Sequence, residues 1–277
     1  MTRLFGILGS PVARSLSPAM HTAALRALKL DALYGAFETP PRFLKPILRA
    51  LVLSGVEGLN VTVPLKEAVM PLLERLDATA TAVGAVNTIV IRNRRAVGYN
   101  TDGIGFRRAL QELGWRPHAA CAVVLGAGGA ARAVAWELAG VKGSCVTIAN
   151  RHPARARRLA RWLSRHRPSA CIRATSLRGV VLGDVELLIN ATTVGMHPED
   201  RPLIDPAGLR RGTLVYDLVY HRQTMLVREA AARGCVAANG RSMLLYQGAE
   251  SLRLWLKRSP PIDVMRRALE QAMDRSP

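Results

Sequence analysis

The sequence carries a glycine-rich loop whose composition and spacing suit a dinucleotide. An apolar run that ends at Leu125 leads into Gly126-Ala127-Gly128-Gly129-Ala130, and a helix-like stretch follows. Glycines at these positions permit a tight turn and let the backbone approach a pyrophosphate at a helix N-terminus. About 20 residues further on, NAD-binding proteins usually carry an acidic residue for the ribose 2′-hydroxyl. This chain instead has Asn150, Arg151 and Arg155, which suit a 2′-phosphate and therefore predict NADP (NADPH) as cofactor.

A lysine and an aspartate could act together in proton transfer, with the lysine as the group that carries the proton. Lys66 follows an apolar segment that ends near Thr62, and it is one of only five lysines among 39 basic residues. A desolvated lysine can lose its proton near neutral pH, which an arginine cannot do. Asp102 beside Lys66 would keep the ammonium charged and oriented, as a general acid requires. The residues alone leave open that Lys66 is a surface lysine and that Asp102 caps the helix after it.

Two serines lie on the loop after the first apolar run. Ser15 and Ser17 could donate two hydroxyl hydrogen bonds to a carboxylate. Ser17 stands before Pro18, so it is also a good N-cap for the next helix, with proline at the first helical position. Capping would explain Ser17 and would leave Ser15 without a role.

The elements that must position these groups alternate between strands and helices, which predicts an α/β protein. Strands are expected over residues 4–8, 33–37, 58–62, 86–91, 96–99, 121–125, 145–149, 171–175, 185–190 and 213–219. Helices are expected over residues 18–28, 42–53, around 79, 103–114, 129–140, 154–166, 242–257 and 261–273. We expect two α/β domains with a cleft between them, and the second of them is a Rossmann-type dinucleotide-binding domain. The expected domains are 1–103 for substrate binding and catalysis, 104–240 for NADP, and 241–277 as C-terminal helices that pack back on the substrate domain, with 114–119 as a linker.

Composition narrows the function classes. The chain has 277 residues, 49% of them hydrophobic, and a net charge of +19. The arginines are scattered, aromatic residues are few, and neither helix-turn-helix nor zinc-finger spacing occurs, so nucleic acid is not the expected partner. A basic field also favours anionic substrates and phosphorylated cofactors. Residues 119–141 are strongly apolar but contain Arg132, Glu137 and the glycine loop, so they predict a buried strand and helix rather than a membrane span.

The cysteines and histidines predict no metal centre. Cys121, Cys145, Cys171 and Cys235 are too widely spaced for a metal or redox motif, and the six histidines are dispersed. Reduced thiols in the core are the expectation, in keeping with a cytoplasmic protein, and the N-terminus lacks the apolar run of a signal peptide. The sequence is compatible with a homodimer and does not fix the oligomeric state.

Taken in order along the chain, the motifs resemble the shikimate dehydrogenase family over nearly the whole length. They are Ser15-x-Ser17-Pro18-x-x-His21, Asn60-Val61-Thr62-x-Pro64-x-Lys66, Gly84-Ala85-Val86-Asn87-Thr88, Asn100-Thr101-Asp102-Gly103, the Gly126 loop, Asn150-Arg151…Arg155, Asn190-Ala191-Thr192-x-x-Gly195-Met196, Asp217-x-x-Tyr220 and Gly240-x-x-Met243-Leu244-x-x-Gln247. The resemblance implies the reversible NADPH-dependent reduction of 3-dehydroshikimate to shikimate, in aromatic amino-acid (chorismate) biosynthesis.

The resemblance also implies roles for individual residues. Lys66 would be the acid/base and Asp102 its partner. The substrate-binding residues would be Ser15, Ser17, Asn60, Thr62, Asn87, Tyr220 and Gln247. The cofactor-binding residues would be Gly126, Ala127, Gly128, Gly129, Ala130, Asn150, Arg151, Arg155, Thr192, Val219, Gly240 and Met243.

One loop departs from the family pattern. Similar chains have Tyr-x-Pro followed by a threonine, whereas this chain has Tyr220-His221-Arg222-Gln223-Thr224, which lacks the proline and is one residue shorter. A quinate/shikimate dehydrogenase that uses NAD is therefore the alternative among enzymes. A ligand-sensing binder without catalysis and a basic nucleic-acid-associated protein are the alternatives from other classes. The presence of both Lys66 and Asp102 argues against the inert binder.

Overall fold

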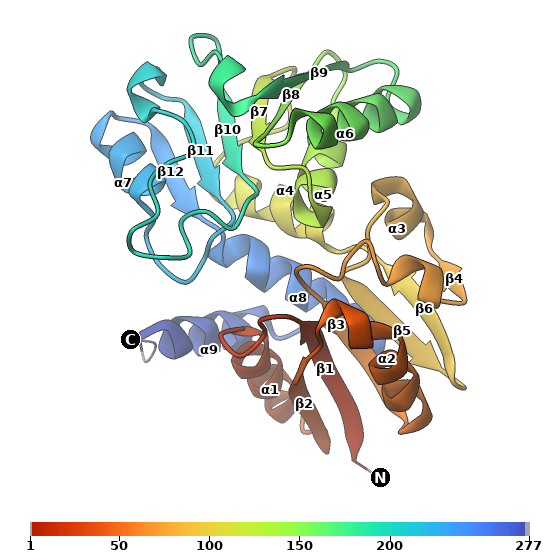
Figure 1. Ribbon diagram of the computed structural model, residues 1–277. Coiled ribbons are helices and arrows are strands. Elements are labelled where there is room, and N and C mark those ends of the chain that lie inside the picture. Colours follow the sequence, from red (N-terminus) through yellow and green to blue (C-terminus); the bar gives the residue numbers. More distant parts are fainter. Residues whose placement is uncertain (1, 275–277) are drawn as a thin grey trace. The chain divides into compact units, whose positions relative to one another are not determined.

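The computed structural model describes residues 2–274 and divides into two compact units (Figure 1). The first unit comprises Met1–Gly105 with Leu244–Pro277, and the second comprises Phe106–Met243. Met1 and residues 275–277, which fall inside the expected domains, lie outside the described residues. The division falls inside helix α4 (Asp102–Glu112), whereas residues 114–119 connect α4 to strand β7 within the second unit.

The first unit is built on a six-stranded mixed sheet in the order β2-β1-β3-β5-β6-β4. Its strands are β1 (Arg3–Gly9), β2 (Ala32–Glu38), β3 (Val56–Val61), β4 (Arg75–Leu76), β5 (Thr88–Arg92) and β6 (Arg95–Tyr99). Its helices are α1 (Ser17–Ala27), α2 (Leu44–Leu53), α3 (Ala78–Val83), α8 (Arg241–Leu256), which starts in the second unit, and α9 (Ile262–Asp274). β1, β2 and β3 are parallel, while β5 and β6 form an antiparallel hairpin beside β3.

Apolar residues from both sides of the sheet build the core of the first unit. α2 contributes Leu44 and Leu48 to a cluster with buried residues of β1, β3 and β5. Helix α8 contributes Trp255, which is 1% exposed, donates from Nε1 to the Ile89 carbonyl at 3.0 Å, and lies 5.3 Å from the ring of Phe5. Because Trp255 fixes α8 to the strands, the polar residues on the preceding turns of α8 also face the sheet.

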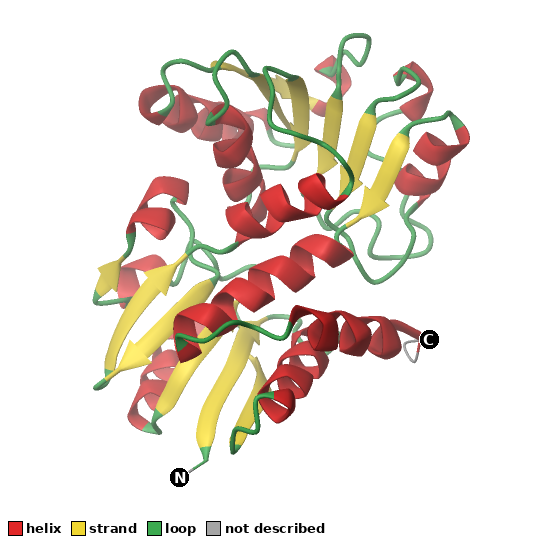
Figure 2. Ribbon diagram, turned by 180° about the vertical axis from the view of Figure 1, so that it is seen from behind, coloured by secondary structure: helices red, strands yellow, loops and turns green. Residues whose placement is uncertain are grey.

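The second unit is built on a six-stranded parallel sheet in the order β12-β11-β10-β7-β8-β9. Figure 2 draws the strands in yellow and the helices in red. Its strands are β7 (Cys121–Leu125), β8 (Cys145–Asn150), β9 (Cys171–Ser176), β10 (Leu187–Asn190), β11 (Leu214–Asp217) and β12 (Val236–Asn239). Its helices are α5 (Gly129–Ala139), α6 (Pro153–His166) and α7 (Met225–Ala232), together with most of α4. The first strand is central, with β8 and β9 on one side and β10, β11 and β12 on the other, which is the doubly wound Rossmann order.

The two sheets confirm the expected α/β class, and the structure contains two β-strands and one α-helix that the sequence pattern did not predict. These are β4, α7 and β12, of two, eight and four residues. Each is too short to show a clear apolar period, and β12 (Val236–Asn239) contains two alanines, which are uncommon in strands.

The structure corrects the expectation that the cysteines lie in the core. Only Cys235 is buried, whereas Cys121 and Cys171 are exposed and Cys145 is half-buried. Cys121, Cys145 and Cys171 are the first residues of β7, β8 and β9, at the edge of the sheet. Because they lie at this edge, the apolar residues that follow them in sequence did not indicate that they are buried.

No helix in the described part of the chain is both long and apolar enough to cross a bilayer.

Candidate active site

Several polar residues of the first unit meet at one edge of its sheet. β1 and β3 are parallel and end at Gly9 and Val61, so the loops that follow them start side by side. The hairpin runs antiparallel to β3, so β5 begins and β6 ends at that same edge. This topology places Asn87, just before β5, and Asp102, just after β6, beside the loop that carries Lys66. The edge therefore collects residues that are far apart in sequence.

Lys66 and Asp102 form a close ion pair. The distance from Lys66 Nζ to Asp102 Oδ2 is 2.5 Å, and the two side chains are 13% and 4% exposed. Asp102 is the first residue of α4, and its backbone N–H donates to Asn100 Oδ1. Asn100 therefore bonds the start of the helix, and the carboxylate of Asp102 is left for Lys66 rather than for capping. Lys66 is correspondingly not an ordinary surface lysine.

Asn87 connects this pair to helix α8. Its Nδ2 donates to Asp102 Oδ1 at 2.9 Å and to Gln247 Oε1 at 3.2 Å. Its Oδ1 accepts from the backbone N–H of Thr101 at 2.7 Å. Asn87 is 2% exposed, so the amide has a fixed orientation. The second carboxylate oxygen of Asp102 is thereby held, and the remaining oxygen faces Lys66.

Asn60 lies deeper, within a network that the sequence motifs indicated only in part. Tyr34 Oη donates to Asn60 Oδ1 at 2.7 Å, and Asn60 Nδ2 donates to Ser251 Oγ at 2.9 Å. Ser251 also hydrogen-bonds Thr88 Oγ1 at 2.8 Å. The sequence analysis missed Tyr34, Thr88 and Ser251. Ser251 could have been found, since it lies one helical turn after Gln247 on the same face of α8.

His21 supports this network from the apolar side. Its ring stacks on Tyr34 with 4.5 Å between centroids and a 7° interplanar angle, and it is fully buried. Burial lowers the pKa of His21 to about 3, so the ring is neutral at physiological pH. A neutral ring can pack flat against Tyr34 and fix the hydroxyl that orients Asn60.

Ser15 and Ser17 lie on the loop between β1 and α1. The backbone N–H of Ser17 donates to Ser15 Oγ at 3.3 Å, and that of Ser15 to the Val12 carbonyl at 2.9 Å. Helix α1 starts at Ser17 itself, with Leu16 in the cap position, so Ser17 is not the N-cap. Thr62 flanks this loop, because Thr62 Cγ2 lies 2.4 Å from where a side chain on Gly9 would begin.

The second unit gathers the expected cofactor residues along the carboxyl edge of its sheet. Leu125 of β7 is in register with Ala149 of β8 and Asn190 of β10, and Asn190 with Asp217 of β11. Asp217 is in register with Asn239 of β12. The residues at or just beyond these strand ends are Gly126, Asn150-Arg151, Thr192, Val219 and Gly240. Because parallel strands end at one edge, all of these residues lie along a single ridge, where ligands of such sheets bind.

The loop after β7 turns tightly and leaves open space at the start of α5. Gly126 has φ of +113°, and a Cβ there would lie 2.8 Å from the Ala191 carbonyl oxygen, so a larger residue is excluded. A Cβ on Gly128 would instead meet open space, within 4 Å of no heavy atom among residues 2–274. Gly128 is the N-cap of α5, and no side chain caps the first N–H groups of this helix, which have no partner within it. These observations fit a phosphate group at the start of α5.

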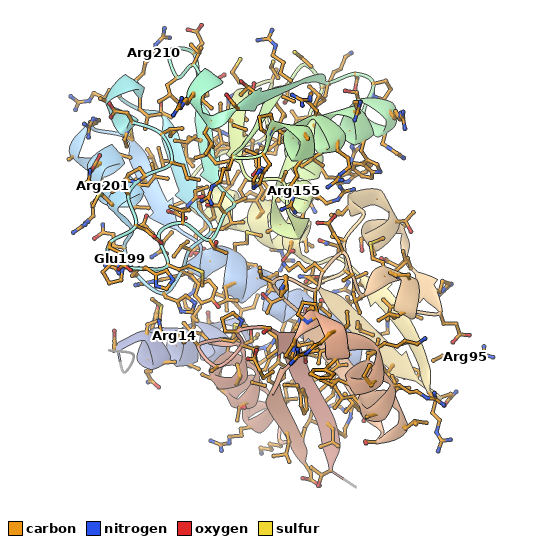
Figure 3. All side chains as sticks on the ribbon, viewed as in Figure 1. Arg14, Arg95, Arg155, Glu199, Arg201 and Arg210 are labelled. Atoms are coloured by element: carbon orange, nitrogen blue, oxygen red, sulfur yellow. The ribbon has the colours of Figure 1, made fainter. Side chains whose placement is uncertain are left out.

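Asn150 ends the neighbouring strand β8, and Arg151 and Arg155 follow it. Asn150 Nδ2 donates to the His152 carbonyl at 3.1 Å, which fixes the turn into α6. Arg151 and Arg155 are both exposed, and neither pairs with a carboxylate among residues 2–274; Figure 3 labels Arg155. Two cations without an acidic partner stand beside the glycine loop, and this arrangement suits a dianionic phosphate.

Asp217 organises the loops at the other end of this edge. Its Oδ1 accepts from Asn190 Nδ2 at 2.9 Å and from the Val219 N–H at 3.0 Å, and its Oδ2 accepts from Thr224 Oγ1 at 2.7 Å. Asn190 Oδ1 in turn accepts from Thr192 Oγ1 at 2.7 Å. Burial raises the pKa of Asp217 to about 6, and the three hydrogen bonds oppose that rise. One carboxylate thus positions the segments of both Thr192 and Val219.

Thr224 anchors the end of the loop that departs from the family pattern. Besides its bond to Asp217, Thr224 is the N-cap of α7 and accepts from the Val227 N–H at 3.3 Å. Thr224 therefore ties the end of this loop to Asp217 and to the start of α7. Tyr220 lies on this loop, with its ring 4.0 Å from that of His221.

We predict that Thr224→Ala destabilises the protein by roughly 3 kcal/mol, the sum of a lost N-cap and an unsatisfied buried carboxylate oxygen. Urea unfolding followed by circular dichroism measures the change. Thr224→Ser is the matched control, since it loses only a methyl group and should retain most of the stability. Equal loss in both variants would show that packing, rather than the hydroxyl, holds this loop.

The sequence and structure match known proteins along their whole length. Residues 7–89 match the model of a shikimate dehydrogenase substrate-binding domain, and residues 240–270 that of a shikimate 5′-dehydrogenase C-terminal domain. The chain is 45% identical to the shikimate dehydrogenase (NADP(+)) of Symbiobacterium thermophilum, covering 99% of this chain and 96% of that protein.

Two solved structures are similar. The first is shikimate 5-dehydrogenase from Thermus thermophilus in complex with NADP(H) and shikimate, with a TM-score of 0.88, 39% identity, and coverage of 98% of this chain and 99% of that one. The second is quinate dehydrogenase from Corynebacterium glutamicum in complex with NAD, with a TM-score of 0.89, 32% identity and the same coverage. From its sequence, its fold and these matches, the chain belongs to the shikimate dehydrogenase family.

Proposed function

We infer that the protein catalyses the reversible NADPH-dependent reduction of 3-dehydroshikimate to shikimate, a step of aromatic amino-acid (chorismate) biosynthesis. The observation that carries this function is the Lys66–Asp102 pair, held by Asn87 at the edge of the first sheet. Family membership and relatives named NADP(+)-dependent shikimate dehydrogenases support it. The tight turn at Gly126 with open space at Gly128, and Arg151 and Arg155 without a carboxylate partner among residues 2–274, support NADP as the cofactor.

Lys66 is the proton donor and acceptor in this proposal. NADPH supplies the hydride to the carbonyl carbon of the substrate. Negative charge then develops on the carbonyl oxygen, and the Lys66 ammonium stabilises that charge before it gives up a proton. Asp102 orients Nζ through the 2.5 Å contact, and Asn87 fixes Asp102. In the reverse direction, neutral Lys66 takes the proton from the hydroxyl group.

The remaining polar groups bind the substrate. Ser15 and Ser17 donate to its carboxylate, and Tyr220 is assigned to the same end. Thr62, Asn87 and Gln247 hydrogen-bond the ring hydroxyls. Asn60 belongs to this set, but protein partners already occupy its amide, so its contribution is to hold Ser251 and the surrounding hydroxyls in place.

In this proposal, the cofactor residues along the second sheet bind different parts of NADPH. Gly126, Ala127, Gly128, Gly129 and Ala130 hold the pyrophosphate, and Asn150, Arg151 and Arg155 hold the 2′-phosphate. Thr192, Val219, Gly240 and Met243 lie toward the nicotinamide end. The Met243 N–H donates to Tyr216 Oη at 3.2 Å, which fixes the start of α8 in the second unit. We further propose a cytoplasmic location, which agrees with four free thiols.

A quinate dehydrogenase that uses NAD is the second candidate, and the likeness to the Corynebacterium glutamicum protein favours it. The arginines argue against NAD, because they would face a 2′-hydroxyl with no charge to neutralise. The serine pair favours shikimate as the substrate.

A steady-state assay that crosses shikimate and quinate with NADP⁺ and NAD⁺ tests the proposal. We expect kcat/KM to be highest for shikimate with NADP⁺, and lower by about tenfold or more when either component is exchanged, because one charged or polar contact is worth about 1.5 kcal/mol. Highest efficiency with quinate and NAD⁺ would establish the second candidate. Binding of shikimate without turnover would show that the protein is a sensor.

A further inference from the structure

Three cysteines form a row across the second sheet. Cys121, Cys145 and Cys171 are the first residues of β7, β8 and β9, and the register pairs Cys121 with Cys145 and Cys145 with Cys171. Residues that face each other across neighbouring strands project to the same side of the sheet. The row therefore lies on one face, at the amino edge of the sheet. The expected cofactor residues lie beyond the opposite edge.

The middle cysteine of this row, Cys145, is in contact with Cys171 at the β9 end. Cys145 Sγ lies 2.9 Å from Cys171 Sγ, with the Cys145 thiol as donor. Both are free thiols. Cys171 is exposed and β9 is the last strand of the sheet, so a solute can reach this sulfur and the strand has room to adjust. Cys145, on the penultimate strand, is half-buried.

We propose that Cys145 and Cys171 form a redox-responsive pair that closes reversibly to an intramolecular disulfide. The oxidant is a low-molecular-weight disulfide such as oxidised glutathione. This site is distinct from the proposed active site and does not depend on the proposed function.

The reaction proceeds by two thiol–disulfide exchanges. The Cys171 thiolate attacks one sulfur of the oxidant, so that a mixed disulfide forms and one small thiolate leaves. The Cys145 sulfur then loses its proton to solvent and attacks Cys171 Sγ, and the second small thiolate leaves. The two protein thiols are oxidised by two electrons, and the small disulfide is reduced to two thiols.

The environments of the two sulfurs assign this order. Burial raises the pKa of Cys145 to about 11, and the hydrogen bond to Cys171 acts in the same direction. Cys145 is therefore a thiol in the resting protein and donates its proton toward Cys171. Cys171 is exposed and accepts that hydrogen bond, so it is the sulfur that meets the oxidant first. The positive charge of Arg173 opposes the effect of burial on Cys145 and favours its later ionisation.

The structure separates this switch from the cofactor edge. Cys145 begins β8, and Asn150 ends it. The disulfide would join β8 to β9, which are already paired along their length. We therefore expect the residues at the carboxyl edge of the sheet to keep their positions. An exposed disulfide of this kind is expected to be labile and to reopen with a small excess of reductant.

Incubation of the native protein with oxidised glutathione, followed by intact mass spectrometry and non-reducing peptide mapping, tests the proposal. We expect the free thiols to fall from four to two, with a linkage between the peptides of Cys145 and Cys171 and full recovery with dithiothreitol. Persistence of four thiols, a Cys121–Cys145 linkage, a stable glutathione adduct, or a disulfide between two chains would each overturn it.

Variants distinguish the roles of the two sulfurs. In Cys145→Ser, the first exchange still occurs and the glutathione adduct remains on Cys171, because the resolving sulfur is gone. In Cys171→Ser, neither adduct nor disulfide forms at this pair. Cys121→Ser is the matched control from the same row and should close as the native protein does. Failure of that control to close would assign the reaction to Cys121 instead and would contradict the proposal.

Discussion

Lys66→Ala is expected to lower kcat by about 10²- to 10⁴-fold while shikimate binding changes by less than about tenfold. The range is that of a lost general acid/base. Lys66 Nζ contacts Asp102 at 2.5 Å, and both side chains are largely shielded from solvent. Bulk water therefore does not readily replace Lys66 as the proton donor. Binding is expected to persist because the proposed carboxylate and hydroxyl ligands belong to other residues. Steady-state assays measure kcat, and equilibrium titration with shikimate measures its binding.

Two further variants separate proton transfer from charge. Lys66→Arg keeps a cation beside Asp102, but a guanidinium does not release its proton in proteins, so its turnover should be close to that of Lys66→Ala. Lys45→Ala removes an exposed lysine from α2 and should behave as the native enzyme. A Lys66→Arg variant with near-native kcat would show that Lys66 contributes only charge. Near-native turnover in Lys66→Ala would remove the residue from the chemistry altogether.

The long elements of this fold could be predicted because their apolar periods are clear. The expected strand at 121–125 and helix at 154–166 agree with β7 and α6 to within one residue. α7 and β12 could not be predicted, because Met225–Ala232 spans barely two turns and Val236–Asn239 has little β-propensity. Their positions follow from the Thr224 cap and from pairing with β11, and pairing is a property of the folded sheet.

The candidate site divides in the same way. Motifs identified Lys66, Asp102 and Asn87, because polar residues near the ends of strands are visible in a sequence. They did not identify Ser251 or Tyr34, which reach Asn60 across the core from distant segments. The structure also contradicts the alternative, left open by the sequence, that Asp102 caps the helix after it. The reason is that Asn100 already bonds the first N–H of α4, and an ion pair with a residue 36 positions away outweighs local capping.

The cysteines show the limit of composition. Three thiols beside apolar strands were expected in the core, but each occupies the first position of its strand, where the sheet meets solvent. Their mutual register depends on strand order, which brings residues 24 and 26 positions apart into one row. The wide spacing of the cysteines in the sequence therefore did not reveal the row that the folded sheet brings together.

Arg151→Ala is expected to weaken NADPH binding by about 10- to 100-fold and NADH binding by less than about threefold. A hydrogen bond to a charged group contributes about 1.5 to 3 kcal/mol, and only NADPH carries the 2′-phosphate. Arg151 follows β8 directly and has no carboxylate partner among residues 2–274, so its charge is available to a ligand. Fluorescence titration with each nucleotide gives the two dissociation constants. Equal loss for both nucleotides would contradict the assignment to the 2′-phosphate.

The net charge of +19 makes a control for the general field essential, because any lost arginine weakens an anion to some degree. Arg161→Ala removes the same charge from an exposed position further along α6 and should change NADPH affinity by less than about threefold. If Arg161→Ala weakens NADPH as much as Arg151→Ala does, the preference comes from the field of the whole protein. Arg151→Lys adds a second comparison, since a lysine retains the charge but loses the two-pronged geometry of the guanidinium. An intermediate affinity in that variant would assign part of the NADPH preference to paired hydrogen bonds at the turn after β8.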